Sequence, residues 1–327
     1  MNLDAFPLYP YKFKPIPKIK PWGGELLYKL FQRHTKLAGK VGESWEISDR
    51  QDDQSIVSNG PLAGTSLHEL ITHYQDKLMG QSQCVQGRFP LLLKLIDAQD
   101  DLSLQVHPPD DYAFTNENES GKTEMWYILH AEPQAIIYCG LKHNISIDQF
   151  HRALLNNDPI ACLQTYQVKT GDAYYLPAGT VHALGKGIVV AEIQENSDQT
   201  YRLYDWGRTD KDGNTRPLHV EKGLQVIRQE HNQNYRLKEG NDPILPSKLL
   251  VRCKHFSVFE NIIQSPQTYI VEHNSFEILT IIQGHGILEH EHQSLDINKG
   301  DFILIPAHLN NFLISPQAPL QVLRTII

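Results

Sequence analysis

Apolar residues along this chain occur mostly in short runs or at alternating positions, which are the patterns of β-strands. The run over residues 91–96 is apolar except for Lys94, as expected for a buried strand that carries one functional lysine. From about residue 247 onward, short strand-like segments follow one another at residues 249–251, 276–282, 302–305 and 322–323, with turn residues such as 284–286 between them. This spacing predicts a β-sandwich or barrel.

Helical patterns are few and short. Two capping boxes precede apolar stripes with helical spacing: Ser66 with Glu69, and Ser146 with Gln149. The pair Asp158-Pro159 has the order of an N-cap followed by a first-turn proline, and predicts another short helix. One more helix is predicted over residues 217–229, and the polar stretch over residues 229–246 has the composition of an interdomain linker.

An internal repeat divides the chain. Residues 169–178 match residues 298–307, and residues 124–129 match residues 277–282. Counting on from the glycine that the two copies share, His182 falls opposite Asn311. We therefore expect a mainly β protein with two related β-domains and a few inserted helices: residues 1–240 with a metal site, and residues 241–327 without one.

Two clusters of polar residues, some 75 positions apart, predict that metal site. Gln105 and His107 alternate along a strand and so share a face, Glu124 opens the next strand-like run, and His182 follows a turn that ends another strand. Two imidazoles, one carboxylate and one amide suit zinc or ferrous iron. Gln105 is either a ligand or a residue that orients His107.

The turn before His182 has the pattern Gly-x5-Pro-x-Gly-x2-His, which is the second signature of the cupin jelly roll. A second group of histidines, at positions 285, 290 and 292, resembles a metal site at first sight. We interpret it as a solvated hairpin, because it lies in an acidic turn region and its domain has Asn311 at the position of the ligand.

Composition narrows the classes of function. The 327 residues carry a formal net charge of −8 without a stripe of lysine and arginine, which argues against a nucleic-acid partner. No segment approaches the roughly 20 apolar residues of a membrane span, and the N-terminus lacks the pattern of a signal peptide. The four cysteines are scattered and are expected to be free thiols. A cytoplasmic protein with a small-molecule substrate is expected, of unknown oligomeric state.

Four ordered motifs resemble the type I mannose-6-phosphate isomerases, most closely their short bacterial form. They are LSLQVHP at residues 102–108, GKTEMWY at 121–127, GTVHAL at 179–184 and SDQTYR at 197–202. The resemblance runs from about residue 5 to the end of the chain and implies two cupin-type jelly-roll domains. The longer members of the family carry an extra helical domain, which the insertion at residues 143–168 is too short to supply.

The resemblance implies one zinc ion per chain held by Gln105, His107, Glu124 and His182. It also implies that Arg202 is catalytic and that Ser103 and Lys94 lie near the phosphate end of a sugar phosphate. The implied reaction interconverts mannose 6-phosphate and fructose 6-phosphate through a cis-enediol, for which a metal ion stabilises developing negative charge.

The residues beside the ligands fit this chemistry, since moving a proton between C1 and C2 needs a base on the same face as both carbons. Lys122, two residues before Glu124, is a candidate for that base. Arg202 would stabilise the enediolate or hold the phosphate, and Asp198 would help to open the sugar ring or orient Arg202. A structural ion pair to Asp97 or Glu124 is the competing account of Lys94.

Two other functions remain open from the residues alone. One is a non-catalytic protein with two cupin domains that binds sugar or metal. The other is an iron-dependent cupin oxygenase, because two histidines and one carboxylate also form a facial triad. Gln105 stands where many such oxygenases have a second histidine, which disfavours this alternative.

Overall fold

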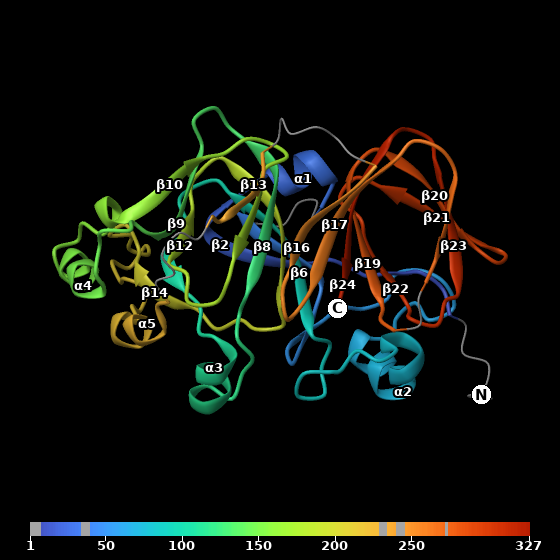
Figure 1. The fold of residues 1–327 in the computed structure, drawn as a ribbon, viewed down its shortest axis with the longest axis horizontal. Helices are drawn as coiled ribbons and strands as arrows, with labels where there is room; N and C mark the ends of the chain where they lie inside the picture. Colours follow the sequence, from blue (N-terminus) through green and yellow to red (C-terminus); the bar gives the residue numbers. More distant parts are fainter. Residues whose placement is uncertain (1–7, 34–39, 229–233, 240–245, 272–273) are drawn as a thin grey trace. The chain divides into compact units, whose positions relative to one another are not determined.

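The computed structural model describes residues 8–33, 40–228, 234–239, 246–271 and 274–327 (Figure 1). Strands dominate the chain, which divides into two compact units. The larger unit consists of residues 17–44 and 93–241, and the smaller unit of residues 1–16, 45–92 and 242–327. Each unit is built around two β-sheets, so the prediction of a mainly β protein with two jelly-roll domains is confirmed.

In the larger unit, a seven-stranded sheet has the order β15-β11-β8-β13-β6-β3-β2. These strands span Arg236–Lys238, Ala173–Leu176, Glu124–Ala131, Ile188–Glu195, Leu91–Ala98, Val41–Ile47 and Ile16–Gly24. A five-stranded sheet has the order β10-β9-β12-β7-β14. Its strands span Leu163–Gln167, Ile136–Leu141, His182–Leu184, Leu104–Val106 and Tyr201–Tyr204.

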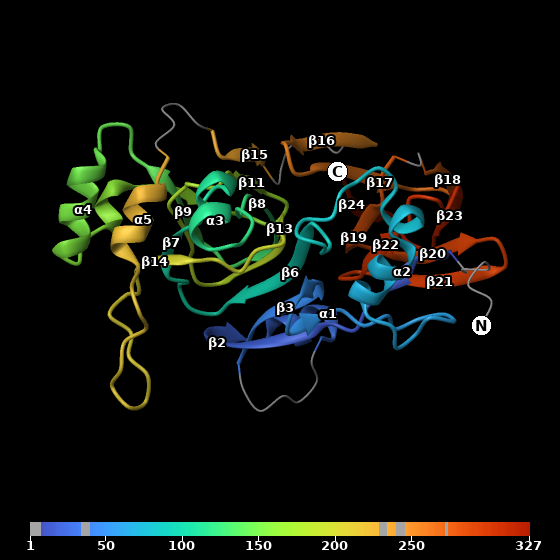
Figure 2. The same cartoon turned by 90° about the horizontal axis from the view of Figure 1, so that it is seen from below.

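Two apolar clusters stabilise this unit. The first draws side chains from both sheets, including Trp126 of β8 and Ile137 of β9, and so fills the space between them. The second joins the five-stranded sheet to helices α4 (Ile147–Leu155) and α5 (Val220–Val226), which lie beside that sheet in Figure 2. Helices α1 (Leu26–Phe31) and α3 (Asp110–Asn116) and a 3-10 turn at Ile160–Cys162 complete the unit.

In the smaller unit, a six-stranded sheet has the order β1-β22-β19-β24-β17-β16. Its strands span Tyr11–Lys12, Phe302–Ile305, Glu277–Gln283, Leu320–Ile326, Ser257–Ile263 and Ser247–Arg252. A four-stranded sheet, β18-β23-β20-β21, spans Gln267–Ile270, Asn311–Pro316, His285–His290 and Gln293–Asn298. Their inner faces bury an aliphatic core, and a ribbon of β4 (Asp49–Arg50) and β5 (Asp53–Gln54) and helix α2 (Leu67–Met79) also belong to this unit.

These units differ from the expected division at residues 240 and 241, because early segments of the chain group with the C-terminal strands. Strand β1 pairs with β22, and carbonyl oxygens at the C-terminal end of α2 accept hydrogen bonds from the backbone N–H groups of Ala307 and His308. The ring of Phe89 lies 4.6 Å from that of Phe276. The hydrophobic pattern of one segment does not reveal these long-range pairings.

Both predicted capping boxes are confirmed, at the N-termini of α2 and α4. Two other helix predictions were wrong in detail. Asp158-Pro159 begins only a 3-10 turn with Pro159 as its N-cap, and the last helix starts at Val220 rather than Pro217. Part of the predicted linker, residues 229–233 and 240–245, lies outside the described residues, and β15 lies between them.

The histidine-rich segment forms the predicted hairpin of β20 and β21, which starts just after Gly284. His285, Glu291 and His292 are exposed, but His290 is buried and its Nδ1 lies 2.8 Å from the carbonyl oxygen of Asn311. The interpretation as a fully solvated hairpin was therefore wrong for His290.

The internal repeat extends to strand register. Glu124 pairs with Leu176 in the larger unit, and its counterpart Glu277 pairs with Ile305, the counterpart of Leu176. The next strand agrees as well, since Glu192 stands opposite Trp126 and Arg324 stands opposite Leu279. In the smaller unit Arg324 forms a two-point ion pair with Glu277, with Nε 2.7 Å from Oε2. A guanidinium thus faces the carboxylate that corresponds to Glu124.

Candidate active site

Strand ends bring the four predicted ligands together in the larger unit. Gln105 lies in β7 and His107 follows its last residue, while Glu124 and His182 are the first residues of β8 and β12. Because β12 pairs with β7, His182 stands opposite Gln105 in the five-stranded sheet. Sequence spacing predicted the shared face of Gln105 and His107, and the pairing of β7 with β12 adds His182.

Three of these side chains form a compact cluster. One ligating atom each from His107, Glu124 and His182 lies within 4.8 Å of the other two, and all three residues are buried. The two Nε2 atoms lie 3.3 Å and 3.5 Å from the Glu124 carboxylate oxygens. The side-chain amide nitrogen of Gln105 lies 3.3 Å from His182 Nε2.

Backbone carbonyls orient both imidazoles. His107 Nδ1 lies 2.8 Å from the carbonyl oxygen of Gln199, and His182 Nδ1 lies 2.9 Å from that of Thr180. Each Nδ1 therefore carries the proton and donates it to a carbonyl, which leaves the Nε2 lone pair facing the cluster. Burial lowers the pKa of His182 to about 4 and lowers that of His107 well below its usual value, so both rings are neutral at pH 7.

The Glu124 carboxylate tests whether this cluster fits a cation. Both of its oxygens are buried, and neither accepts a hydrogen bond from the described residues. Lys122 Nζ lies 2.9 Å from Oε1 and supplies charge on one side only. Buried carboxylate oxygens are normally hydrogen-bonded, so the lack of hydrogen bonds to Glu124, together with two inward lone pairs of nitrogen, suits a divalent metal ion. Gln105 fits as a further metal ligand when its side-chain amide is turned so that the oxygen faces the cluster.

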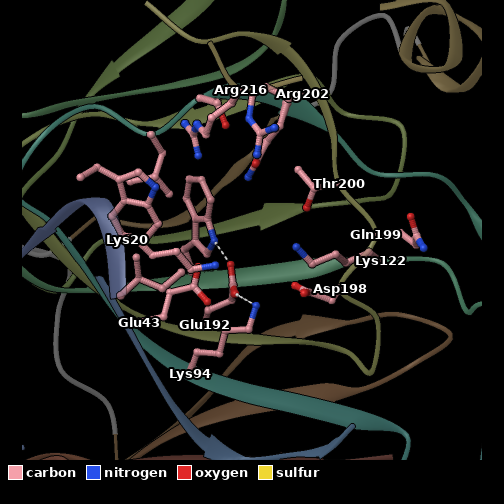
Figure 3. A pocket seen from close by; sticks show the side chains of 16 residues that line it. Lys20, Glu43, Lys94, Lys122, Glu192, Asp198, Gln199, Thr200, Arg202 and Arg216 are labelled. Atoms are coloured by element: carbon pink, nitrogen blue, oxygen red, sulfur yellow. Dashed lines mark hydrogen bonds and ion pairs between the residues drawn. The ribbon is translucent and has the colours of Figure 1, made fainter. Parts of the chain in front are cut away.

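A polar cavity of about 300 Å³ adjoins the cluster (Figure 3). Gln105 and Lys122 line it and connect it to the cluster, since Lys122 Nζ also lies 3.2 Å from His107 Nε2. The other predicted residues outside the ligand set line the same cavity: Lys94, Ser103, Asp198 and Arg202. The structure therefore brings all nine predicted site residues to one place.

The charge of the cavity wall is opposite to that of the whole chain. Five cationic side chains line it, Lys20, Lys94, Lys122, Arg202 and Arg216, against three carboxylates, Glu43, Glu192 and Asp198. The excess of two positive charges stands in a protein whose net charge is −8. Such a wall favours a small ligand with about two negative charges.

Arg202 and Arg216 come together on one side of the cavity in Figure 3. Arg202 donates from Nη1 to the carbonyl oxygen of Pro217 at 2.9 Å, and its buried Nε has no hydrogen-bond partner among the described residues. Burial, and then the charge of Arg216, lower the pKa of Arg202. Arg216 is itself held by Asp205, with Nε 2.7 Å from Oδ2. No sequence pattern indicates Arg216, because it lies in a polar loop.

The ion-pair partner of Lys94 is Glu192, which sequence reasoning missed. Lys94 Nζ lies 3.2 Å from Glu192 Oε2 and donates to Gln194 Oε1 at 2.6 Å. Lys94 therefore lines the cavity and has a structural ion pair, but its partner here is Glu192, which the competing account did not name. A signal for Glu192 was present, since a carboxylate within the apolar strand β13 requires a partner of opposite charge, just as Lys94 does in β6.

A jelly-roll domain whose strand ends gather two histidines, a glutamate and a glutamine beside a cationic cavity defines a metal-binding cupin for a small anionic ligand. Comparison with known proteins narrows this class. Residues 12–127 match the family "Phosphomannose isomerase type I, catalytic domain", and residues 247–324 match "Mannose-6-phosphate isomerase, cupin domain".

Whole-chain relatives agree with both matches. Mannose-6-phosphate isomerase ManA of Bacillus subtilis is 38% identical over 311 residues, which cover 93% of this chain and 95% of the relative. A mannose-6-phosphate isomerase of Streptococcus mutans is 34% identical over 287 residues, covering 88% and 89% of the two chains. The chain therefore belongs to the type I mannose-6-phosphate isomerase family.

Solved structures support the fold. The crystal structure of the mannose 6-phosphate isomerase from Bacillus subtilis has a TM-score of 0.87 at 35% identity, covering 97% of this chain and 99% of that one. A mannose 6-phosphate isomerase bound with zinc and yttrium has the same fold, with a TM-score of 0.74 at 16% identity. In the described part of the chain, no helix has the length and apolarity needed to cross a membrane.

Proposed function

We propose that this protein is a cytoplasmic, zinc-dependent isomerase that interconverts mannose 6-phosphate and fructose 6-phosphate through a cis-enediol intermediate. The observation that carries the proposal is the cavity with two excess positive charges beside the His107, Glu124 and His182 cluster. A phosphate dianion balances that excess, and the relatives named above act on this sugar phosphate by name. Membership of the family supports the same reaction.

His107, Glu124, His182 and Gln105 would hold one zinc ion. When bound, zinc supplies a Lewis acid that stabilises negative charge on the substrate oxygens. The neutral imidazoles are already in the protonation state that binding requires, and the Glu124 oxygens accept no hydrogen bond from the described residues that a metal ion would have to replace. The mannose 6-phosphate isomerase bound with zinc and yttrium lends support to this choice of metal.

Lys122, Asp198 and Arg202 would perform the chemistry. Lys122 Nζ stands against the ligand cluster, and Asp198 lines the same cavity, so either side chain can move a proton at C1 or C2 of a bound sugar. The Arg202 guanidinium would stabilise the enediolate or hold the phosphate. Ser103 and Lys94 would contact the substrate from the cavity wall, with Arg216 added to the cationic groups that receive the phosphate.

The test is fructose 6-phosphate formation from mannose 6-phosphate by purified protein before chelation, after chelation, and after zinc is added back. We expect turnover that a chelator abolishes and zinc restores. Mannose without its phosphate is the matched control, because it lacks the dianion that the positive cavity wall would bind. We expect kcat/KM to be at least about tenfold lower for this neutral sugar. Zinc-loaded protein without turnover would refute the proposed reaction.

A metal analysis of the same samples separates the alternatives. Stoichiometric iron with oxygen consumption would indicate a cupin oxygenase. Tight binding of mannose 6-phosphate without any product would indicate a non-catalytic sugar-binding protein.

A further inference from the structure

Glu192 is a buried carboxylate that the proposed chemistry does not use. It lies in the middle of β13, where every residue is buried, and the residue is 3% exposed. Oε2 lies 3.2 Å from Lys94 Nζ, and Oε1 accepts a hydrogen bond from Trp126 Nε1 at 2.8 Å. Figure 3 draws both interactions as dashed lines. A carboxylate this deeply buried is costly unless it is paired, so its place at the cavity wall needs a reason.

We infer that Glu192 is a positioning residue that keeps Lys94 charged and holds its ammonium group at the cavity wall, facing the sugar phosphate. The inference rests on the proposed function, because it takes the anionic substrate from there. It adds a residue that neither the sequence motifs nor the ligand cluster identified.

Glu192 acts on Lys94 first through its charge. Lys94 is only 3% exposed, and such burial favours the neutral amine. Four carboxylates oppose that effect: Glu192 most strongly, then Glu43, Asp198 and Glu124. Their combined effect raises the pKa of Lys94 above its usual value, and Glu192 forms a close ion pair with it, at 3.2 Å between Nζ and Oε2.

Hydrogen bonds also fix the direction of the Lys94 side chain. Lys94 Nζ also donates to Gln194 Oε1 at 2.6 Å, and residues 192 and 194 share one face of β13. Gln194 is fixed in turn, since its amide nitrogen donates to the carbonyl oxygens of Glu195 and Ser197. The bond to Trp126 fixes the other oxygen of Glu192. Neither partner of the ammonium group is free to turn away.

The experiment uses the zinc-loaded enzyme and the variant Glu192→Gln. Glutamine keeps the size of the side chain and an acceptor for Trp126, but removes the charge. Glu43→Gln is the matched control, because Glu43 lines the same cavity and is 3.1 Å from Lys20 Nζ. Glu192→Asp keeps the charge and shortens the side chain.

The direct readout is the NMR titration of lysine side chains labelled with ¹³C at Cε, with the Lys94 signal assigned by its loss in Lys94→Arg. We expect no titration of Lys94 up to about pH 10.5 in the parent enzyme or in Glu192→Asp. In Glu192→Gln its pKa should fall by more than about one unit, because burial then acts against fewer negative charges. Glu43→Gln should shift the titration less.

The kinetic readout is the pH profile of kcat/KM for mannose 6-phosphate. Glu192→Gln should gain an alkaline limb in which kcat/KM falls about tenfold for each pH unit. The double variant Glu192→Gln with Lys94→Arg should lose that limb, because a guanidinium stays charged throughout this range.

Unchanged titration of Lys94 in Glu192→Gln would overturn the inference, as would equal losses in Glu192→Gln and Glu192→Asp without an alkaline limb. Failure of the parent enzyme to isomerise mannose 6-phosphate would refute the proposed function instead. The NMR titration would then still decide whether Glu192 keeps Lys94 charged.

Discussion

Acidification should destabilise the metal-free protein through His182. In the folded protein its pKa is about 4, against 6.5 for the ordinary group. Between these values the unfolded chain binds more protons than the folded one, so stability rises with pH and is lost as pH falls from about 6.5 towards 4. From pH 7.5 to pH 5, these two pKa values correspond to about 2 kcal/mol.

The assay is urea unfolding of the chelated protein at pH 7.5 and pH 5, followed by tryptophan fluorescence. Replacing Trp45 by Phe in every sample leaves three tryptophans, Trp22, Trp126 and Trp206, all of which belong to the larger unit. The fluorescence change then reports the unit that contains His182 rather than the whole chain.

The comparison variant is His182→Asn, which cannot take up the proton. Its free energy of unfolding should fall with acidification by about 2 kcal/mol less than that of the parent, because the remaining acid sensitivity comes from other groups such as His107. An equal loss in both proteins would refute the reasoning and would mean that His182 titrates at its ordinary value in the folded state.

Three further predictions concern single residues. Either His182→Ala or Glu124→Ala should lose zinc and activity together, and atomic-absorption analysis that finds full zinc in an active variant would remove that residue from the site. Arg202→Ala should keep zinc and lose turnover by about a hundredfold or more, since one electrostatic contact in a transition state is typically worth that much; a normal kcat would contradict the assignment. Arg324→Met should destabilise the smaller unit by roughly 3–5 kcal/mol in thermal or urea unfolding, because it leaves Glu277 buried without its cation. Adding Glu277→Gln should recover part of that loss. An Arg324→Met variant as stable as the parent would contradict the prediction.

Local patterns predicted much of the fold. Capping boxes located two helices, and the buried run around Lys94 located β6. The start of the last helix was wrong because Pro217 is compatible with a first turn, yet its carbonyl oxygen instead accepts a hydrogen bond from Arg202. That contact joins residues 15 positions apart and leaves no mark on the periodicity of either segment.

The candidate site was predictable where residue types that bind metal stand at positions that the strand pattern places on one face or at a strand end. His107 and Glu124 stand at strand ends in segments that resemble a known family, and they come together as expected. Glu192 and Arg216 were missed for different reasons. Glu192 lies in a strand long enough to be interpreted as core, and Arg216 lies in a loop, where an ion pair with Asp205 holds it at the cavity.

The matched registers of the two domains have a consequence for how metal supply affects this protein. In the smaller unit, Arg324 occupies the strand position that Glu192 has in the larger one, and it provides Glu277 with a positive charge that is part of the polypeptide. One copy of the repeat thus carries in its own chain a cation that contacts both oxygens of this carboxylate, whereas Glu124 is paired by Lys122 at one oxygen and would take a further cation from solution. Metal scarcity would therefore affect one half of a duplicated scaffold, and the other half would keep its charge balance whatever the surroundings supply.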